Sequence, residues 1–190
     1  MSRQKIVIKV TLIGDAAVGK TSLRNRFMGK GFRGDHLMTI AADFAVKEDE
    51  ITVDDKKYSV AYQVWDMAGD KKFTQLRTRF FNGTMAGLCV FDVTKLESFN
   101  SVPKWIEEIW KNNGQGVIPI ILLGNKSDLR DKKSIPVTKG QEYAKMLSGR
   151  TSREGYDVHY MDTSAKDGIN IKEAFHSIGT TVIRKMLGNK

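Results

Sequence analysis

Two kinds of hydrophobic pattern alternate along the chain. Short runs of apolar and β-branched residues, typical of strands, occupy residues 5–13, 44–52, 57–65, 87–93, 117–123 and 158–161. The short segment Val53-Asp54-Asp55 separates the second run from the third and predicts the tight turn of a hairpin. The runs at 87–93 and 117–123 are almost continuously apolar, which suits strands covered on both faces.

Helical spacing of apolar residues fills most of the intervals between these runs. It predicts helices at residues 19–28, 98–112, 138–147 and 169–187. Gly29, Gly31 and Gly34 interrupt the pattern after the first of them and predict a mobile loop. Residues 148–155 are polar and contain glycine, so we expect a loop there as well.

The alternation of strands and helices, with one hairpin, predicts the fold class. The expected architecture is an α/β domain of three layers, with a mostly parallel six-stranded sheet and one antiparallel hairpin strand. At 190 residues the chain is expected to form a single domain, residues 1–190. Ligands on such sheets bind in the loops at the carboxyl ends of the strands.

Composition and charge narrow the functional classes only slightly. The formal net charge of +9 suits an anionic partner, but the basic residues are scattered and a solvated basic surface is the simpler explanation. No basic stretch is interleaved with aromatic residues, so we expect no nucleic-acid partner. No run reaches the ~18 apolar residues of a membrane span, and the single cysteine, Cys89, lies in an apolar run that suits a buried thiol. These features favour a cytoplasmic protein.

A phosphate-binding loop is the first candidate site. Between the first strand and the first helix the chain matches G-x-x-x-x-G-K-[ST] with Gly14, Asp15, Ala16, Ala17, Val18, Gly19, Lys20 and Thr21. The backbone N–H groups of such a loop and of the helix that follows bind negative charge. Lys20 is expected to reach the β- and γ-phosphates and the Thr21 hydroxyl to bind Mg²⁺. Ser22 is placed with the nucleotide-binding residues. The alternative is a chance glycine-rich turn.

Asp66 and Gly69 form the second candidate site. Asp66 follows a predicted strand, where its carboxylate can hold Mg²⁺ through water. Gly69 has no side chain to prevent its amide from approaching a γ-phosphate. Asp-x-x-Gly alone is more often a plain turn. Its position after a phosphate loop and a hairpin favours the metal and phosphate role.

Two further segments suit a purine base. Asn125, Lys126 and Asp128 follow the run at 117–123. The carboxylate of Asp128 can accept the N1–H and exocyclic N–H of guanine, donors that adenine lacks there. The stem of Lys126 can lie against the base, and the Asn125 side chain can tie this loop to the phosphate loop. The alternative for this tetrapeptide alone is a polar surface turn.

The last candidate segment follows the final predicted strand and consists of Ser164, Ala165 and Lys166. The N–H of Ala165 could donate to guanine O6, whereas the amino group of adenine could not accept this bond. The tripeptide has little specificity by itself, so its weight comes from its position in the fold.

With these residues placed, the chain resembles the small GTPases of the Ras superfamily over about residues 5–187, and among them the Rab branch. Residues 39–44 (TIAADF) are similar to the first switch of that branch, and residues 80–83 (FFNG) to the end of its second. The resemblance implies a P-loop GTPase fold and a molecular switch that binds GTP and GDP with Mg²⁺, hydrolyses GTP slowly and acts in vesicle trafficking.

The resemblance also implies roles for single residues. Thr39 would close over the nucleotide and complete the metal ligands, which are then Thr21, Thr39 and Asp66. Phe32 would pack edge-on against guanine, with anchoring of the loop on apolar surface as the alternative. The groups around the reacting γ-phosphate would be Lys20, Thr39, Gly69 and Asp70.

The expected partners follow from the same resemblance. Phe44, Trp65 and Phe80 would form an aromatic patch that effector and regulatory proteins contact, with ordinary core packing as the alternative. We expect a monomer. Relatives carry a flexible tail with prenylated cysteines, but this chain ends at Gly188-Asn189-Lys190. Either the tail was removed or it never existed, and in the second case peripheral membrane association would depend on charge or on a partner.

Two departures from the family pattern affect hydrolysis. The family usually has Gln after Asp-x-x-Gly, where it orients the attacking water, but this chain has Asp70. Aspartate is shorter and anionic, so we expect slow or partner-dependent hydrolysis; alternatively, Asp70 faces solvent and another group places the water. Ala16 and Ala17 stand where the Ras branch has glycines, and their side chains can crowd an incoming arginine finger.

Three other functions compete with a hydrolysing switch. A module that binds GTP without cleaving it would follow from Asp70. A P-loop kinase or ATPase would use the same phosphate loop, with Asp128 a mere turn residue. A nucleic-acid-binding protein is suggested only by the charge.

Overall fold

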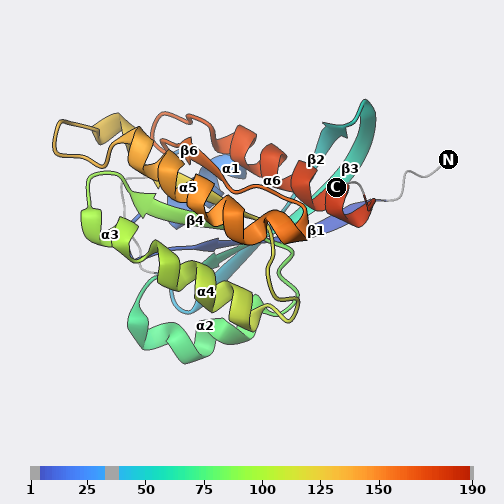
Figure 1. Cartoon of the computed structure of the whole chain (residues 1–190), viewed down its shortest axis with the longest axis horizontal. Helices are drawn as coiled ribbons and strands as arrows, with labels where there is room; N and C mark the ends of the chain where they lie inside the picture. The colour runs from blue at the N-terminus through green and yellow to red at the C-terminus, as the bar shows by residue number, and fades with distance from the viewer. Residues whose placement is uncertain (1–4, 33–38, 189–190) are drawn as a thin grey trace.

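Six strands form one sheet in the computed structural model, which describes residues 5–32 and 39–188 (Figure 1). The strands are β1 (Ile6–Ile13), β2 (Ala42–Val53), β3 (Lys56–Met67), β4 (Ala86–Asp92), β5 (Ile120–Asn125) and β6 (His159–Asp162). Their order is β2-β3-β1-β4-β5-β6. β2 and β3 are antiparallel, and the other neighbouring pairs are parallel. The predicted fold class is therefore confirmed.

Helices cover both faces of the sheet and complete the three layers (Figure 1). α1 (Lys20–Phe27) and α6 (Ile171–Met186) pack on one face. The other face carries α2 (Thr74–Phe81), α3 (Leu96–Asn100), α4 (Val102–Asn112) and α5 (Val137–Thr151). Because helices cover both sides, every residue of the apolar strands β4 and β5 is buried.

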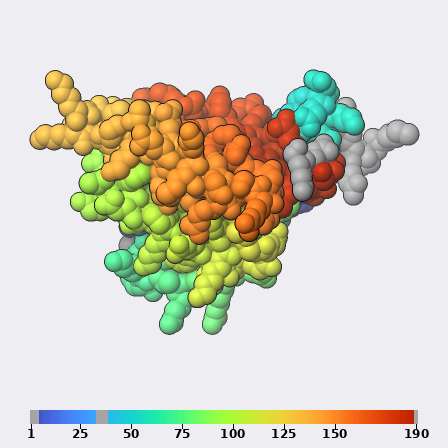
Figure 2. Space-filling view, viewed as in Figure 1, coloured from blue at the N-terminus to red at the C-terminus, as the bar shows by residue number. Residues whose placement is uncertain are grey.

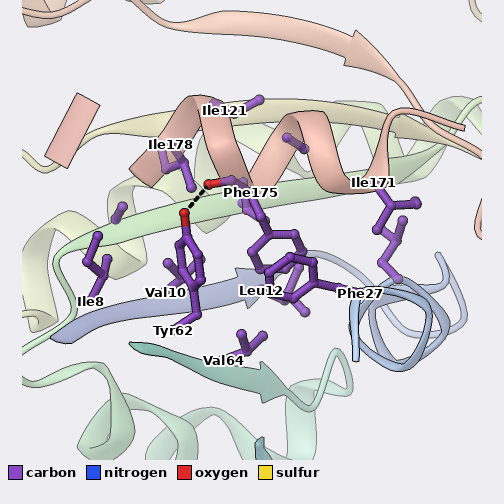
Figure 3. Close-up of a cluster of buried hydrophobic side chains, with 14 of the residues drawn as sticks. Ile8, Val10, Leu12, Phe27, Tyr62, Val64, Ile121, Ile171, Phe175 and Ile178 are labelled. Atoms are coloured by element: carbon purple, nitrogen blue, oxygen red, sulfur yellow. Dashed lines mark hydrogen bonds between the residues drawn. The ribbon is translucent and has the colours of Figure 1, made fainter. Parts of the chain in front are cut away.

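The packing under α6 joins three elements (Figure 3). The ring of Phe27 from α1 stacks on Phe175 of α6 with centroids 3.7 Å apart. Tyr62 of β3 meets both rings edge-on and donates its hydroxyl to the Phe175 carbonyl oxygen over 2.9 Å. This cluster fixes α1, and with it the loop between β1 and α1, against the sheet.

The β2–β3 hairpin has the predicted tight turn, with strands longer than expected. Asp54 and Asp55 have φ angles of 48° and 62°, which match the two-residue turns that suit the twist of a hairpin. The tip of the hairpin projects at one end of the molecule (Figure 2). Of the loop predicted to be mobile after α1, residues 33–38, including Gly34, lie outside the described residues.

Three expectations about helices were wrong or incomplete. Residues 148–155 are not a loop, because α5 continues to Thr151 and a 3₁₀ helix, Ser152–Glu154, follows. The hydroxyls of Ser148 and Thr151 bond to the carbonyl oxygens of Ala144 and Tyr156, which accommodates polar residues in the last helical turns. The predicted helix 98–112 is two helices divided at Ser101, with Pro103 in the first turn of the second. Helix α2 was not predicted.

Among the residues described, no helix combines the length and the apolar character that crossing a bilayer requires.

Candidate functional site

All four candidate segments lie at the carboxyl ends of parallel strands, as expected. The loop after β1 begins at Gly14, Asp66 lies near the end of β3, Asn125 ends β5, and Ser164 follows β6. Because these strands run parallel in one sheet, their carboxyl ends, and with them the four segments, lie at the same edge. Hydrogen bonds between the segments, described below, join them into a single site.

The phosphate loop has a backbone suited to anions. Ala17 and Gly19 have φ angles of 61° and 99°, and α1 begins directly after them. The Lys20 ammonium donates to the carbonyl oxygens of Gly14 and Asp15 at 2.8 and 2.7 Å, so it lies across the loop. Burial lowers the pKa of Lys20 to about 8, although Asp66 opposes this shift. A buried cation and a loop that leads into the N-terminus of a helix together favour an anionic ligand.

Thr21, Thr39 and Asp66 come together as an oxygen cluster. The Thr21 hydroxyl bonds to Asp66 Oδ2, and the Thr39 hydroxyl lies 3.1 Å from Thr21 Oγ1 and 3.3 Å from Asp66 Oδ2. Asp66 is fully buried, which raises the pKa of its carboxyl, while the nearby Lys20 opposes the rise. Its second oxygen, Oδ1, is buried without a hydrogen-bond partner in the part of the chain described. One carboxylate, two hydroxyls and an unused buried oxygen fit a Mg²⁺ ion, which prefers oxygen ligands and keeps some water.

Gly69 lies directly against the phosphate loop. A Cβ atom at this position would lie 2.3 Å from the backbone nitrogen of Ala16 and 2.3 Å from the carbonyl carbon of Asp15. No residue with a side chain fits there without displacing the loop backbone. This contact places the Asp66–Gly69 segment beside the phosphate loop, where the sequence predicted it.

The Asp70 side chain is engaged by its own turn. Asp70 Oδ1 accepts from the backbone N–H of Lys72 at 3.0 Å, and Oδ2 lies 3.3 Å from Lys72 Nζ. The hydrogen bond from the Lys72 backbone holds the pKa of Asp70 below its usual value. Asp70 therefore caps the 3₁₀ helix Lys71–Phe73, and both of these carboxylate contacts are with Lys72.

A pocket next to the phosphate loop collects the residues assigned to the base. It is lined by Gly19, Ser22, Phe32, Asn125, Lys126, Asp128, Leu129, Ala165 and Lys166. Eight of these nine residues were predicted to bind the nucleotide, and Leu129 was missed. Leu129 sits in the 3₁₀ helix Ser127–Leu129 directly after the Asn125 motif, so its position beside that motif was the available signal.

Asn125 connects three of the loops. Its side-chain N–H₂ donates to the Val18 carbonyl oxygen at 2.8 Å, which is the bond to the phosphate loop that the sequence predicted. Its Oδ1 accepts from the Ala165 N–H at 3.3 Å and from the Thr163 hydroxyl at 3.3 Å. The close approach of Asn125 also explains Gly19, since a Cβ there would lie 2.3 Å from Asn125 Nδ2.

Asp128 and Lys126 are both held by partners. The Ser164 hydroxyl donates to Asp128 Oδ1 at 2.7 Å, so the two segments assigned to the base are bonded to each other. Lys126 has a left-handed backbone, φ 63°, and its ammonium lies 2.7 Å from Asp92 Oδ2. The sequence analysis missed Asp92, although a buried aspartate that ends an apolar run was a signal for it.

The three aromatic residues assigned to partner binding also form one cluster. The ring centroids of Phe44 and Trp65 are 5.0 Å apart, and those of Trp65 and Phe80 are 5.7 Å apart. Phe44 is 45% exposed, whereas Trp65 and Phe80 pack partly on the core beneath α2. Core packing therefore accounts for part of this patch, and its contact with partner proteins stays a prediction.

Comparisons with known proteins agree with this geometry. The model of the Ras family matches residues 9–184. The chain is 36% identical to the Ypt/Rab-type GTPase YPT7 of Saccharomyces cerevisiae over 97% of this chain and 85% of the relative. It is 35% identical to the Ypt/Rab-type GTPase ypt7 of Pyricularia oryzae, over 96% and 85%. It is also 33% identical to the Ras-related protein RABA4b of Arabidopsis thaliana, over 93% and 72%. The chain therefore belongs to the Ras family of small GTPases, in its Rab branch.

Proposed function

We propose that this small GTP-binding switch binds GTP and GDP together with Mg²⁺ and hydrolyses GTP slowly. The observation that carries the proposal is the convergence of two ends of one site. The buried Lys20 and the Thr21, Thr39 and Asp66 oxygens lie at the phosphate end, and Asp128 lies in the base pocket. Their distribution matches the charge of a guanosine phosphate, with anion-binding groups at one end and a carboxylate at the other.

Guanine preference is assigned to Asp128 and Ala165. The Asp128 carboxylate, held by Ser164, would accept the N1–H and exocyclic N–H of guanine, and the Ala165 N–H would donate to O6. Adenine would leave the Asp128 carboxylate without these donors once the base covers it, which costs about 1–3 kcal/mol per group. Phe32 and the stem of Lys126, both lining the pocket, would cover the base.

Thr21, Thr39 and Asp66 would hold the metal. When bound there, the ion would supply positive charge next to the phosphates. Thr39 lies in the first switch loop, about residues 30–41, and Gly69 in the second, about residues 66–80, so their contacts with the γ-phosphate would order these loops. Loss of that phosphate on hydrolysis would release them.

Slow hydrolysis is proposed because the residue at the position expected to orient the attacking water is poorly suited to that role. Asp70 replaces the usual Gln, and its carboxylate is occupied by Lys72. Unassisted relatives turn over on the order of 10⁻⁴ to 10⁻² per second, and we expect this chain to lie at or below that range. Lys20 would still withdraw charge from the γ-phosphate, so basal cleavage is not abolished.

A second candidate, a module that binds GTP with little or no cleavage, is favoured by the same capped Asp70. The two are separated by single-turnover hydrolysis, in which bound GTP is followed by chromatography. Conversion of bound GTP to GDP over hours supports the switch. Persistence of GTP over days, in protein that remains folded, supports the module.

The partly exposed aromatic patch Phe44, Trp65 and Phe80 is proposed as the surface that effector and regulatory proteins contact. It adjoins both switch loops, so its accessibility would follow the nucleotide state. We propose that the protein acts as a monomer in the cytoplasm in vesicle trafficking, with peripheral membrane association, if any, through its basic surface or a partner.

The test of guanine recognition is Asp128→Asn. We expect its preference to shift from guanine toward xanthine nucleotides, because the amide can donate to the xanthine oxygen that replaces the amino group of guanine. Asp131→Asn, three residues away in an exposed turn, is the control and should keep the wild-type preference. An Asp128→Asn variant that binds GDP as tightly as the wild type would contradict the assignment.

A further inference from the structure

A hydrogen bond joins the phosphate loop to α4. The indole Nε1 of Trp105 donates to Oδ1 of Asp15 over 2.7 Å. Trp105 is only 4% exposed and lies in the helix that covers one face of the sheet. The carbonyl oxygen of the same Asp15 accepts from Lys20. Asp15 is therefore held from both sides, by its backbone toward Lys20 and by its side chain toward α4.

The negative charge of the Asp15 carboxylate is unfavourable for binding phosphate in this position. It adds a negative charge to a loop whose N–H groups and lysine are arranged to attract phosphate. Like charges close together repel strongly in a partly buried site. A carboxylate free to rotate toward the ligand would oppose nucleotide binding, so the direction in which it is held affects affinity.

Arg77 of α2 supplies positive charge on the face of the same indole. Its guanidinium carbon lies 4.2 Å from the centroid of the Trp105 ring, within the range of a cation–π contact. The side chain is 2% exposed and makes two hydrogen bonds to Glu108, at 2.8 and 3.0 Å. This arrangement fixes the plane of the indole, and hence the direction of its N–H.

Arg77 also reaches the second switch loop. Its Nη1 donates to the carbonyl oxygens of Ala68 and Asp70, at 3.3 and 2.9 Å, on both sides of Gly69. Gly69 in turn packs against the backbone of Asp15 and Ala16. The phosphate loop and the second switch loop are thus joined twice, directly at Gly69 and through the pair Trp105–Arg77.

We propose that Trp105, fixed by Arg77, is a positioning residue for the nucleotide. Its N–H holds the Asp15 carboxylate on the α4 side of the phosphate loop, away from the bound phosphates. This inference rests on the proposed function, because it requires phosphate to bind in that loop. A triphosphate carries more negative charge than a diphosphate, so GTP depends on this restraint more than GDP does.

The test is Trp105→Phe, which removes the N–H and keeps a buried aromatic ring. Hydrogen bonds to charged groups are among the stronger ones, so we expect the dissociation constant for GDP to rise about tenfold. The rise for a non-hydrolysable GTP analogue should be larger. The matched control is Trp110→Phe, because Trp110 lies on the same helix and donates its Nε1 to the Ile118 carbonyl oxygen at 3.0 Å. It should bind as the wild type does.

Rescue separates positioning of a charge from simple packing. Asp15→Asn, introduced into the Trp105→Phe variant, removes the charge that needs restraint and should restore most of the lost affinity. Raising the salt concentration should likewise reduce the difference in nucleotide affinity between Trp105→Phe and wild type, since salt screens the repulsion. Affinity that neither Asp15→Asn nor salt improves would overturn the inference, as would equal effects of Trp105→Phe and Trp110→Phe.

Folding and the parent proposal are checked in the same series. If Trp105→Phe does not fold, benzothienylalanine at position 105 replaces the N–H with sulfur in a ring of the same outline, with the same expected result. Wild-type protein serves as the reference for the proposed function. If it binds no guanine nucleotide, that function fails; if it binds but the variants behave as wild type, only the role of Trp105 fails.

Discussion

Asn125 donates its side-chain amide to the carbonyl oxygen of Val18 over 2.8 Å and so joins the end of β5 to the phosphate loop. The same side chain accepts from the backbone N–H of Ala165, at 3.3 Å. One buried amide thus sets the distance between the groups assigned to the phosphates and those assigned to the base.

Asn125→Ala should weaken the binding of GDP and of GTP to a similar extent. Its loss leaves a buried carbonyl oxygen and a buried N–H without partners, at about 1–3 kcal/mol each, so affinity should fall about tenfold or more. The release rate of a fluorescent GDP measures the effect. Asn112→Ala is the control, because the Asn112 amide donates to the Glu108 carbonyl oxygen within its own helix. Similar release rates for the two variants would contradict the role of Asn125.

Asp70→Gln should accelerate single-turnover hydrolysis by about fivefold or more. Glutamine is longer than aspartate and uncharged, so it can reach and orient the water without repelling the γ-phosphate. Asp131→Gln is the matched control, since Asp131 also caps a turn through a backbone N–H, that of Lys133 at 2.9 Å. A rate for Asp70→Gln at or below that of wild type would mean that another group places the water.

Arg77→Ala should lower the free energy of unfolding by about 3–5 kcal/mol, because it leaves Glu108 and two carbonyl oxygens without their buried cation. Urea unfolding of the nucleotide-free protein measures this loss. Arg184→Ala breaks an exposed ion pair with Asp54 and should change stability far less. Equal losses for the two variants would show that the Arg77 contacts contribute little.

Asp92→Asn should lower stability more at pH 7 than at pH 3. Burial alone would raise the pKa of Asp92, but hydrogen bonds from Lys126 and Thr94 outweigh it and hold the pKa below its ordinary value of 3.8. A carboxyl with a lowered pKa stabilises the fold above the unfolded-state value and loses this contribution as the pH falls through the folded-state value. We expect a cost of about 1–3 kcal/mol at pH 7.

Unfolding of Asp92→Asn and wild type at the two pH values checks this prediction. The exposed Asp157→Asn is the control and should show little change at either pH. A cost for Asp92→Asn that is the same at pH 3 and pH 7 would mean that the charge of Asp92 is not the source of its effect.

The strands and the motifs were predictable because their signals are local. The apolar runs at β4 and β5 reflect burial on both faces, and the phosphate loop is recognisable from eight consecutive residues. Helix α2 was missed because it contains five polar and basic residues among its eight, and its apolar side is defined by the aromatic patch and the core under it. The end of α5 was missed because its last turns are polar. The Thr151 hydroxyl there bonds to the carbonyl oxygen of Tyr156, which lies beyond the helix.

The residues that support the site were harder to predict from the sequence. Asp92 and Trp105 touch site residues that are distant in sequence, and the Trp105–Asp15 bond spans 90 positions. Arg77 reaches Trp105 from another helix. Trp105 followed the helical spacing of α4 and was interpretable only as core. A hydrophobic pattern shows that a residue is buried, but the partner of its one polar atom depends on how the helices pack.

The central claim, that the loops form one site for a guanine nucleotide and its metal, is tested most directly by equilibrium binding. The folded chain is stripped of ligand and titrated with GDP, GTP and ATP in the presence of Mg²⁺. The account predicts uptake of one equivalent of GDP or GTP, no competition by excess ATP, and faster nucleotide release when Mg²⁺ is chelated. Absence of GDP and GTP uptake, or equal binding of ATP, would contradict it.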